Sequence, residues 1–154
     1  LTGNQNNYFP KQKRKEIKEM NELIYESINN GVYKCGFAVK QDVYEKAVKK
    51  LFETLDELDQ ILSNSNYLIG DMITEADLRL IPTLLRFDCV YLTHFKCNIN
   101  RIIDYKNLHR HMKDLLENKA IKNTFNIDHI KRHYFCSHES INPNRIIPLG
   151  PNDL

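Results

Sequence analysis

Two cysteines and a histidine lie close together in the stretch RFDCVYLTHFKCN, which runs from Arg86 to Asn98. Cys89, His94 and Cys97 are residue types that bind zinc or act as nucleophiles. On a continuous helix, Cys89 and Cys97 would point about 80° apart, and His94 would point about 140° from Cys89. Such a spread prevents three ligands from meeting at one tetrahedral ion, and a helix break near Thr93 would supply no fourth ligand. We therefore expect buried thiols here and no metal site.

A second pair of candidate metal ligands, His129 and His133, lies near the C-terminus. Their spacing of four places both on one face of a helix, as in many zinc sites. However, no Glu follows His129, and Lys131 and Arg132 add positive charge beside any cation. The sequence therefore favours surface histidines that form hydrogen bonds.

Cys35 is the remaining candidate for thiol chemistry. It follows Lys34 in what we expect to be a loop, and a nearby cation lowers the pKa of a thiol. The four cysteines are widely spaced and include no C-x-x-C, a pattern that indicates reduced thiols in a cytoplasmic protein. G-x-S-x-G, P-loop and G-x-G-x-x-G motifs do not occur in the sequence.

The chain has eight tyrosines and no tryptophan. Tyr33 is expected in a glycine-flanked loop, Tyr91 near the end of an apolar helix, and Tyr134 beside His133. A phenol can donate and accept hydrogen bonds at neutral pH without ionising. Buried tyrosines usually place that hydroxyl at the edge of the core, however, and spacing alone favours this structural role.

Helical periodicity dominates the elements that must position these residues. From Lys11, apolar residues recur at spacings of three and four as far as Asn29–Gly31, an NNG sequence typical of a helix end. Gln41–Leu62 has the clearest amphipathic stripe, and Asn107–Leu116 and one or two helices within 119–135 follow. Strand-like alternation is scarce. We therefore predict an all-α bundle of about five or six helices.

The helix that carries Tyr91 is predicted to be the central one. It begins at a capping box formed by Thr74 and Asp77, and its residues are apolar almost all round. Pro82 lies inside it and should remove one backbone hydrogen bond and bend the helix.

The chain is long enough for one globular domain, with 154 residues of which 42% are apolar and 27% charged. We divide it into a flexible linker (1–10), a helical domain (11–136) and an extended tail packed on that domain (137–154). The tail contains three of the five prolines. Interleaved charges with a net charge of +2 argue against nucleic-acid binding, and the apolar runs are too short for a membrane span.

Four strings carry a family resemblance: NNGVYKCGFA (Asn29–Ala38), ITEADLRL followed by RFDCVYLTHFKCN, FNIDHIKRHYF (Phe125–Phe135) and SHESINPNRIIPLGP (Ser137–Pro151). A capping box that opens a central, proline-bearing helix resembles the C-terminal domain of glutathione transferases. The longer strings are similar to the xi class, the glutathionyl-hydroquinone reductases, and occur in order over nearly the whole chain. One departure is Leu78, where the family usually carries Trp.

The resemblance implies a reaction and a role for each of three tyrosines. In that family, a cysteine of an N-terminal thioredoxin-like domain removes glutathione from a glutathionyl-hydroquinone, and a second glutathione resolves the mixed disulfide. The helical domain forms the wall of the acceptor site. By motif match, Tyr33 is the proton donor or acceptor, while Tyr91 and Tyr134 support the substrate and lower the pKa of the cysteine. Glutathione is then a co-substrate bound mainly by the other domain, and no metal is needed.

No part of the sequence has the strands and cysteine motif of a thioredoxin-like domain, which needs roughly 80 residues. We therefore expect the chain to be one half of a larger transferase and to be inactive alone. The resemblance to glutathione transferases, which are generally dimers, further implies a homodimer. Its partners would be the thioredoxin-like domain and a small aromatic quinol. Two alternatives remain: an omega-like transferase acting on other oxidised substrates, and a non-enzymatic protein-interaction module.

Overall fold

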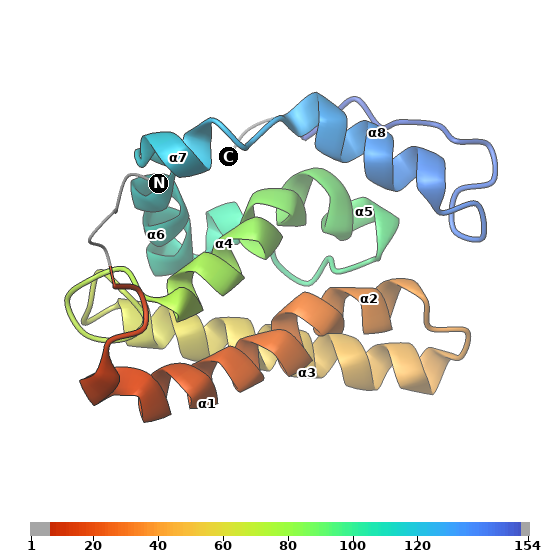
Figure 1. The fold of residues 1–154 in the computed structure, drawn as a ribbon. Helices are drawn as coiled ribbons and strands as arrows, with labels where there is room; N and C mark the ends of the chain where they lie inside the picture. The colour runs from red at the N-terminus through yellow and green to blue at the C-terminus, as the bar shows by residue number, and fades with distance from the viewer. Residues whose placement is uncertain (1–6, 152–154) are drawn as a thin grey trace.

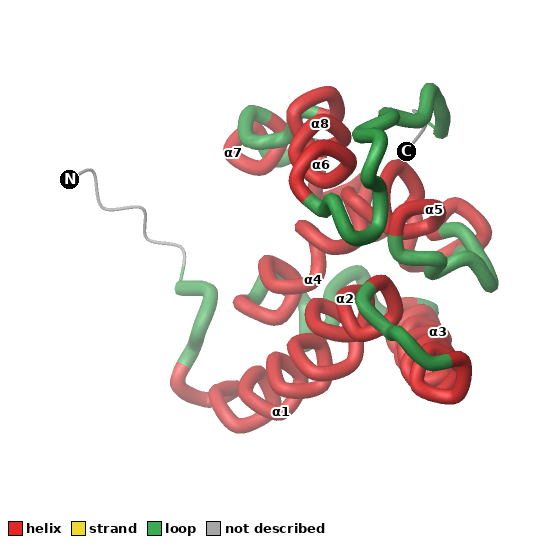
Figure 2. Tube along the Cα trace, turned by 90° about the vertical axis from the view of Figure 1, so that its right-hand side faces the viewer, coloured by secondary structure: helices red, strands yellow, loops and turns green. Residues whose placement is uncertain are grey.

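The computed structural model describes residues 7–151, and within this range the regular structure is helical, with no strand (Figures 1 and 2). The all-α prediction is confirmed. The helices are α1 (Arg14–Ile24), α2 (Asn30–Gly36), α3 (Gln41–Leu62), α4 (Glu75–Arg86), α5 (Leu92–His94), α6 (Lys106–Leu116), α7 (Lys119–Lys122) and α8 (Ile127–Ser137). π-helical turns join α1 to α2 (Tyr25–Asn29) and α4 to α5 (Phe87–Tyr91), so that the α- and π-helical residues of the described range form six continuous runs.

The run formed by α4 and α5 lies between two groups of helices, with α1, α2 and α3 on one side and α7 and α8 on the other (Figure 1). Contacts join α2 to α3, α1 to α4, α3 to α6, and α8 to the π-turn that precedes α5. The core fills the spaces between these runs and includes the fully buried Ile17, Ile28, Leu51, Leu55, Leu80, Leu84, Phe87 and Phe95. None of the helices within residues 7–151 is both long and apolar enough to span a bilayer.

The helix expected to stop at Asn29–Gly31 continues to Gly36, so this prediction was wrong. The reason is tertiary packing. The side-chain amide of Asn29 donates hydrogen bonds to Thr83 Oγ1 (2.7 Å) and to the carbonyl oxygen of Arg79 (3.1 Å) on α4. Gly31 does not adopt the positive φ of a helix cap, and it lies against Leu51 of α3. Tyr33 and Cys35 therefore lie on helix α2 and not in a loop.

The start of α4 follows the predicted capping box. The backbone N–H and the hydroxyl of Thr74 both donate to Asp77 Oδ2, at 2.8 and 2.9 Å. The other carboxylate oxygen of Asp77 accepts from the backbone N–H of Leu68 (3.0 Å). Because all of these groups are buried, the box fixes the first turn of the central helix from inside the core.

Both ends of the chain extend beyond the described range, so residues 1–6 of the expected linker and 152–154 of the tail lie outside it. Next to the first gap, the carbonyl oxygen of Tyr8 accepts a hydrogen bond from the N–H of Glu75 (2.8 Å) at the start of α4. Beyond α8, Asn142 Nδ2 donates to the carbonyl oxygen of Phe135 (2.8 Å), and Lys131 Nζ donates to that of Leu149 (2.8 Å). The tail therefore returns along α8.

Candidate functional site

Three phenol hydroxyls from distant parts of the chain meet at one place. Tyr33 comes from α2, Tyr91 from the π-turn after α4, and Tyr134 from α8. The hydroxyl of Tyr134 lies 2.8 Å from that of Tyr33 and 2.8 Å from that of Tyr91. The structure thus brings together all three tyrosines singled out in the sequence, as a hydrogen-bonded row with Tyr134 in the middle.

Phe95 holds two of these rings in place. Its ring stacks on that of Tyr91 (centroids 5.4 Å apart, planes 10° apart) and lies 5.1 Å from that of Tyr33. Phe95 approaches the backbone of α2 so closely that a Cβ added at Gly36 would lie 2.2 Å from Phe95 Cδ1. A glycine is therefore needed at position 36 for Phe95 to pack this closely against α2. The residues near Tyr33 in the sequence thus contribute to helix packing as well as to the site.

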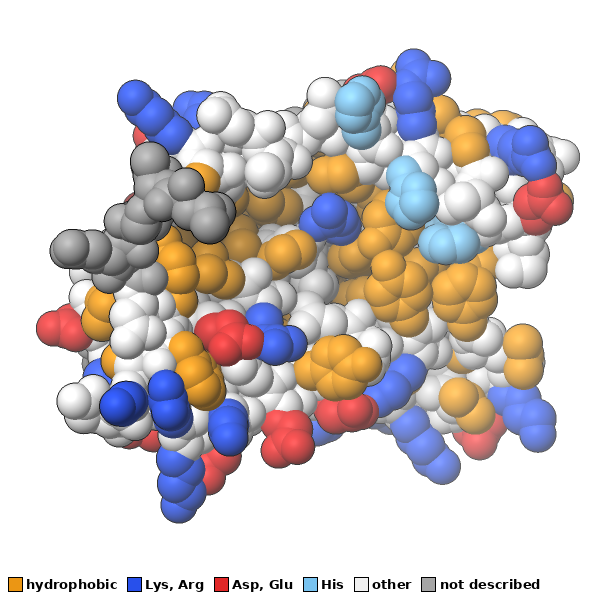
Figure 3. All heavy atoms as spheres, in the orientation of Figure 1, with side chains coloured by type: hydrophobic (Ala, Val, Ile, Leu, Met, Phe, Trp, Pro, Cys, Tyr) orange, Lys and Arg blue, Asp and Glu red, His pale blue; other side chains and the backbone are white. Residues whose placement is uncertain are grey.

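The three tyrosines differ in their access to solvent. Tyr33 is 38% exposed, whereas Tyr134 and Tyr91 are 7% and 3% exposed. Phe37, which is also exposed, stacks in parallel with the ring of Tyr33, with centroids 6.5 Å apart. Histidine side chains border the apolar patch on this face (Figure 3). We call Tyr33, Tyr91, Tyr134, Phe37 and Phe95 the tyrosine wall; it presents one accessible phenol backed by two buried ones.

Burial keeps the phenols of Tyr33 and Tyr91 protonated. Desolvation, followed by the hydrogen bond between Tyr33 and Tyr134, raises the pKa of Tyr33 to about 12. Desolvation and the neighbouring Tyr134 likewise raise the pKa of Tyr91 well above its ordinary value. At neutral pH, therefore, Tyr33 can donate a proton or a hydrogen bond to a ligand, while Tyr134 and Tyr91 can donate along the row toward any charge that develops on it.

A histidine pair that the sequence did not reveal lies beside the wall. His94 Nε2 is 3.0 Å from His138 Nδ1, and the ring of His138 lies 5.7 Å from that of Tyr134. Burial, and then the charge of His138 and of Lys96, lower the pKa of His94 to about 4, so it is neutral at pH 7. His94 and His138 follow Tyr91 and Tyr134 at helical spacings of three and four, but the contact between the two histidines joins residues 44 positions apart, and no spacing predicts it.

The opening cluster Cys89, His94 and Cys97 does not converge. Cys89 Sγ contacts the carbonyl oxygen of Leu85 at 3.5 Å, His94 pairs with His138, and Cys97 forms a hydrogen bond with Cys35. His129 and His133 are exposed on α8. Among residues 7–151, no group of three or more His, Cys, Asp or Glu side chains is placed to hold a metal ion.

Cys35 differs from its expected environment. It is almost fully buried on α2, and the hydrogen bond from Cys97 is the main cause of its lowered pKa, with burial acting in the opposite direction. Lys34 does not contribute as predicted, because its ammonium pairs with Glu26 Oε2 at 3.1 Å. The expected position of Cys35 in a loop was therefore wrong, and Lys34 is not the cause of its lowered pKa.

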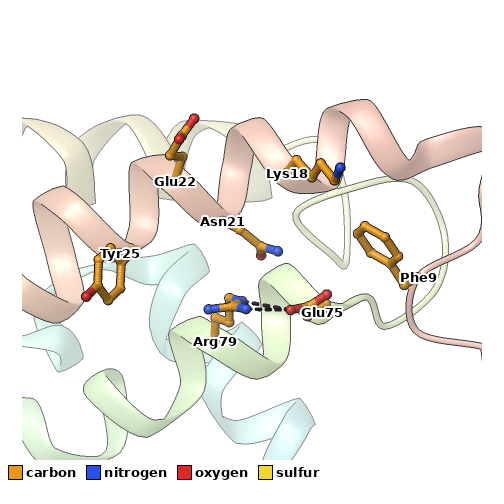
Figure 4. A pocket seen from close by; sticks show the side chains of 7 residues that line it. All are labelled: Phe9, Lys18, Asn21, Glu22, Tyr25, Glu75 and Arg79. Carbon is orange, nitrogen blue, oxygen red and sulfur yellow. Dashed lines mark hydrogen bonds and ion pairs between the residues drawn. The ribbon is translucent and has the colours of Figure 1, made fainter.

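A separate cavity of about 470 Å³ lies between α1 and α4 (Figure 4). Asn21 of α1 and Arg79 of α4 point into it, and the guanidinium of Arg79 pairs with Glu75 Oε1 at 2.6 Å. Its lining mixes charged and aromatic side chains and does not include the tyrosine wall. Because the guanidinium of Arg79 is already paired with Glu75, this cavity has fewer polar groups free to bind a ligand than the tyrosine wall has.

Residues 41–114 match the family described as glutathione S-transferase, C-terminal domain. Over 144 residues the chain is 51% identical to the glutathionyl-hydroquinone reductase YqjG of Escherichia coli (strain K12), covering 94% of this chain and 44% of that protein. It is 46% identical over 147 residues to the glutathione S-transferase omega-like 2 of Schizosaccharomyces pombe, covering 93% and 47%.

Two solved structures share the fold. The glutathione-bound structure of YqjG superposes with a TM-score of 0.94 at 50% identity, covering 97% of this chain and 48% of that one. The xi glutathione transferase of Phanerochaete chrysosporium gives a TM-score of 0.94 at 53% identity, covering 96% and 48%. The chain thus spans about half the length of the relatives it matches. By sequence and by fold, it is a glutathione S-transferase C-terminal domain, closely homologous to that part of the xi-class transferases and glutathionyl-hydroquinone reductases.

Proposed function

We propose that this chain forms the acceptor-substrate wall of a glutathione-dependent reductase that removes glutathione from glutathionyl-hydroquinones. The observation that carries the proposal is the row of three phenols, in which the exposed Tyr33 is hydrogen-bonded to Tyr134, and Tyr134 to Tyr91. The ring of a quinol would lie against exposed Tyr33 and Phe37. The name of the Escherichia coli relative supports the choice of substrate.

In the proposed reaction, a cysteine thiolate of a thioredoxin-like domain attacks the sulfur of the glutathionyl group. The bond between sulfur and the aromatic carbon breaks, the carbon takes up a proton, and a mixed disulfide with glutathione forms. A second glutathione thiolate then attacks this disulfide, which releases glutathione disulfide and restores the cysteine thiolate. The sulfur is oxidised from thioether to disulfide, and the ring carbon is reduced.

We assign the proton-transfer step to Tyr33. With a pKa of about 12 its phenol is protonated at neutral pH, and it is the accessible member of the row. A phenol that gives up or shares its proton becomes negatively charged, and a hydrogen bond from Tyr134 compensates that charge. Tyr91 in turn supports Tyr134. Because Tyr91 and Tyr134 are buried, we propose that they act on the substrate and on the cysteine mainly through Tyr33.

The test is Tyr33→Phe in a protein that carries this chain together with a thioredoxin-like domain. Release of hydroquinone should fall by about 10²- to 10⁴-fold, the usual contribution of a positioned acid or base. Glutathione binding and the helical circular-dichroism signal should not change. Tyr25→Phe is the matched control, because Tyr25 belongs to the same helical run and is exposed outside the wall. Equal rates for Tyr33→Phe and the unmodified protein would refute the proposal.

An omega-like transferase is the second candidate, since the Schizosaccharomyces pombe relative carries that name. Its substrates would be oxidised compounds such as dehydroascorbate or glutathione mixed disulfides, which need no proton delivered to an aromatic carbon. If Tyr33→Phe left activity on such substrates intact and a glutathionyl-hydroquinone proved to be no substrate, the omega-like function would replace the proposed hydroquinone reductase function. A pure interaction module has no evident need for three hydroxyls joined in one row.

We further propose that glutathione is bound mainly by the thioredoxin-like domain, that the protein is a homodimer and that it works in the cytoplasm. None of the four cysteines (Cys35, Cys89, Cys97 and Cys136) forms a disulfide bond, which suits a reducing compartment. A two-fold symmetric dimer is the commonest oligomer, and sedimentation of the purified protein measures its oligomeric state directly. A monomer at micromolar concentration would exclude the dimer.

A further inference from the structure

An apolar groove of about 280 Å³ lies between α4, α7 and α8. Leu78, Pro82 and Leu85 of α4 form one side, and Phe125 and Ile130 form the other. Figure 3 shows apolar side chains gathered in a hollow between these helices, with a basic side chain within it. The groove is at the lower limit of the volumes that hold small molecules.

Arg86 is the charged residue in the lining of this groove. Its Nη1 donates to the carbonyl oxygen of Pro82 at 2.6 Å, and it forms no ion pair with an acid within residues 7–151. A guanidinium has five N–H donors, so most of its hydrogen-bonding capacity is unused. By contrast Arg79, two turns earlier on α4, is paired with Glu75.

The half-buried guanidinium of Arg86 lies against apolar walls, where a charge costs free energy unless an anion pairs with it. The planar fork of a guanidinium matches a carboxylate, which it binds through two parallel hydrogen bonds. The walls of the groove would cover a hydrocarbon skeleton. The combination is selective for a molecule that is apolar except for one acidic group.

We propose that this groove binds a small apolar carboxylate, with its hydrocarbon part between α4 and α8 and its carboxylate paired with Arg86. The site is distinct from the tyrosine wall, although the two are neighbours: the charge of Arg86 partly offsets the burial that raises the pKa of Tyr33 and of Tyr91. The inference does not depend on the proposed reductase function, because it concerns binding to this chain itself.

The test compares 2-naphthoate with its neutral isostere 2-naphthamide, each titrated into the chain by calorimetry. Naphthoate should bind at least tenfold more tightly, as expected for a charge-assisted pair. Arg86→Met should abolish that preference and leave the affinity for naphthamide unchanged. Arg79→Met removes an arginine of the same helix that is already ion-paired, and should leave both affinities as they were. Equal binding of the two ligands, or an unchanged preference in Arg86→Met, would overturn the proposal.

Two further measurements test the same site if Arg86→Met disturbs the fold. Leu78→Trp adds bulk to the groove wall and should weaken both ligands by a similar factor. A diazirine-bearing benzoate should label peptides from α4 and from the α7–α8 region on photolysis, and excess naphthoate should prevent that labelling. Labelling confined to other helices would show that the carboxylate binds elsewhere.

Discussion

The hydrogen-bonded hydroxyls of Tyr33, Tyr134 and Tyr91 form a row along which burial increases. The outer phenol meets solvent, the middle one is nearly buried, and the inner one is deepest in the core. Each hydroxyl can both donate and accept, so the row can reverse its hydrogen-bond direction when the outer phenol loses its proton. An isolated exposed tyrosine would rely on water for the same compensation, which gives the two buried residues a reason to be tyrosine and not phenylalanine.

His94 makes the stability of this region sensitive to acid. Its pKa is lowered to about 4, by burial first and then by the charges of His138 and Lys96, from an ordinary value of 6.5. A lowered pKa means that the folded state binds the proton less readily than the unfolded chain does. The stability contributed by neutral His94 is therefore complete above pH 6.5 and is lost as the pH falls from 6.5 toward 4.

The measurement is the free energy of unfolding by urea at pH 7.5 and at pH 4.5. The decrease between these two values should be smaller in His94→Gln than in the unmodified chain, because glutamine does not titrate. His129→Gln, at an exposed position on α8, is the control and should show the full decrease. If His94→Gln lost as much stability as the unmodified chain, the acid sensitivity would lie with other groups.

At the scale of elements, local signals predicted most of the helices. Gln41–Leu62 has the predicted bounds, α6 begins one residue before the predicted start, and the capping box of α4 is formed by Thr74 and Asp77 as expected. These features depend on periodicity and on hydrogen bonds between near neighbours, and both are visible in one sequence.

The exceptions are the elements that place the site tyrosines. Asn29 and Gly31 are residues typical of a helix end. Here, however, the side-chain amide of Asn29 forms hydrogen bonds with α4, and Gly31, which has no side chain, packs against Leu51 of α3. π-helical turns precede Tyr33 on one helical run and contain Tyr91 on another. Such turns frequently mark functional sites, yet they depend on tertiary contacts and cannot be found from apolar spacing.

Two glycines of α2 allow a matched test of how this helix positions the wall. A Cβ at Gly36 would lie 2.2 Å from Cδ1 and 2.9 Å from Cβ of Phe95, a fully buried ring that cannot move aside freely. Gly36→Ala should therefore lower the free energy of unfolding by about 2 kcal/mol or more. A Cβ at Gly31 would meet only Leu51, at 3.6 Å, so Gly31→Ala should be neutral or stabilise by about 0.5–1 kcal/mol.

Thermal or urea unfolding of the two variants measures this difference. Because Phe95 contacts the rings of both Tyr33 and Tyr91, Gly36→Ala should also change the near-ultraviolet circular dichroism of the tyrosines, and Gly31→Ala should not. Equal stability of the two variants would contradict the close approach of Phe95 to α2.

For the whole molecule, the meeting of the three phenols is the feature that spacing could not predict. The hydrogen bonds join residues 101 and 43 positions apart, and each tyrosine on its own has the ordinary profile of a residue at the edge of a core. The family resemblance selected these three from eight, and the fold brings them together. Phe37 and His138 follow Tyr33 and Tyr134 by four residues, but that spacing alone assigns them no role, and the position of Arg86 in the groove depends on the tertiary fold.

In the proposed reaction, the tyrosine wall would supply a proton donor and a binding surface but no accessible nucleophile. Cys35, Cys89 and Cys97 are buried, and the exposed Cys136 lies on α8 and is not part of the wall. We therefore expect the chain alone to fold, with a strong helical circular-dichroism signal, and yet to produce no glutathione disulfide from a glutathionyl-hydroquinone and glutathione.

The deciding measurement compares the chain alone with the chain joined to a thioredoxin-like domain, at equal concentration and under the same glutathione. Only the joined protein should turn over, and replacement of the cysteine in the added domain by serine should abolish its activity while the wall remains intact. Turnover by the chain alone that is lost in Cys136→Ser would contradict this expectation, because it would place the nucleophile on α8. In the proposed reaction, a thiolate must reach the glutathionyl sulfur while the ring lies on Tyr33, so catalysis would require two surfaces that face each other, of which this chain would provide one.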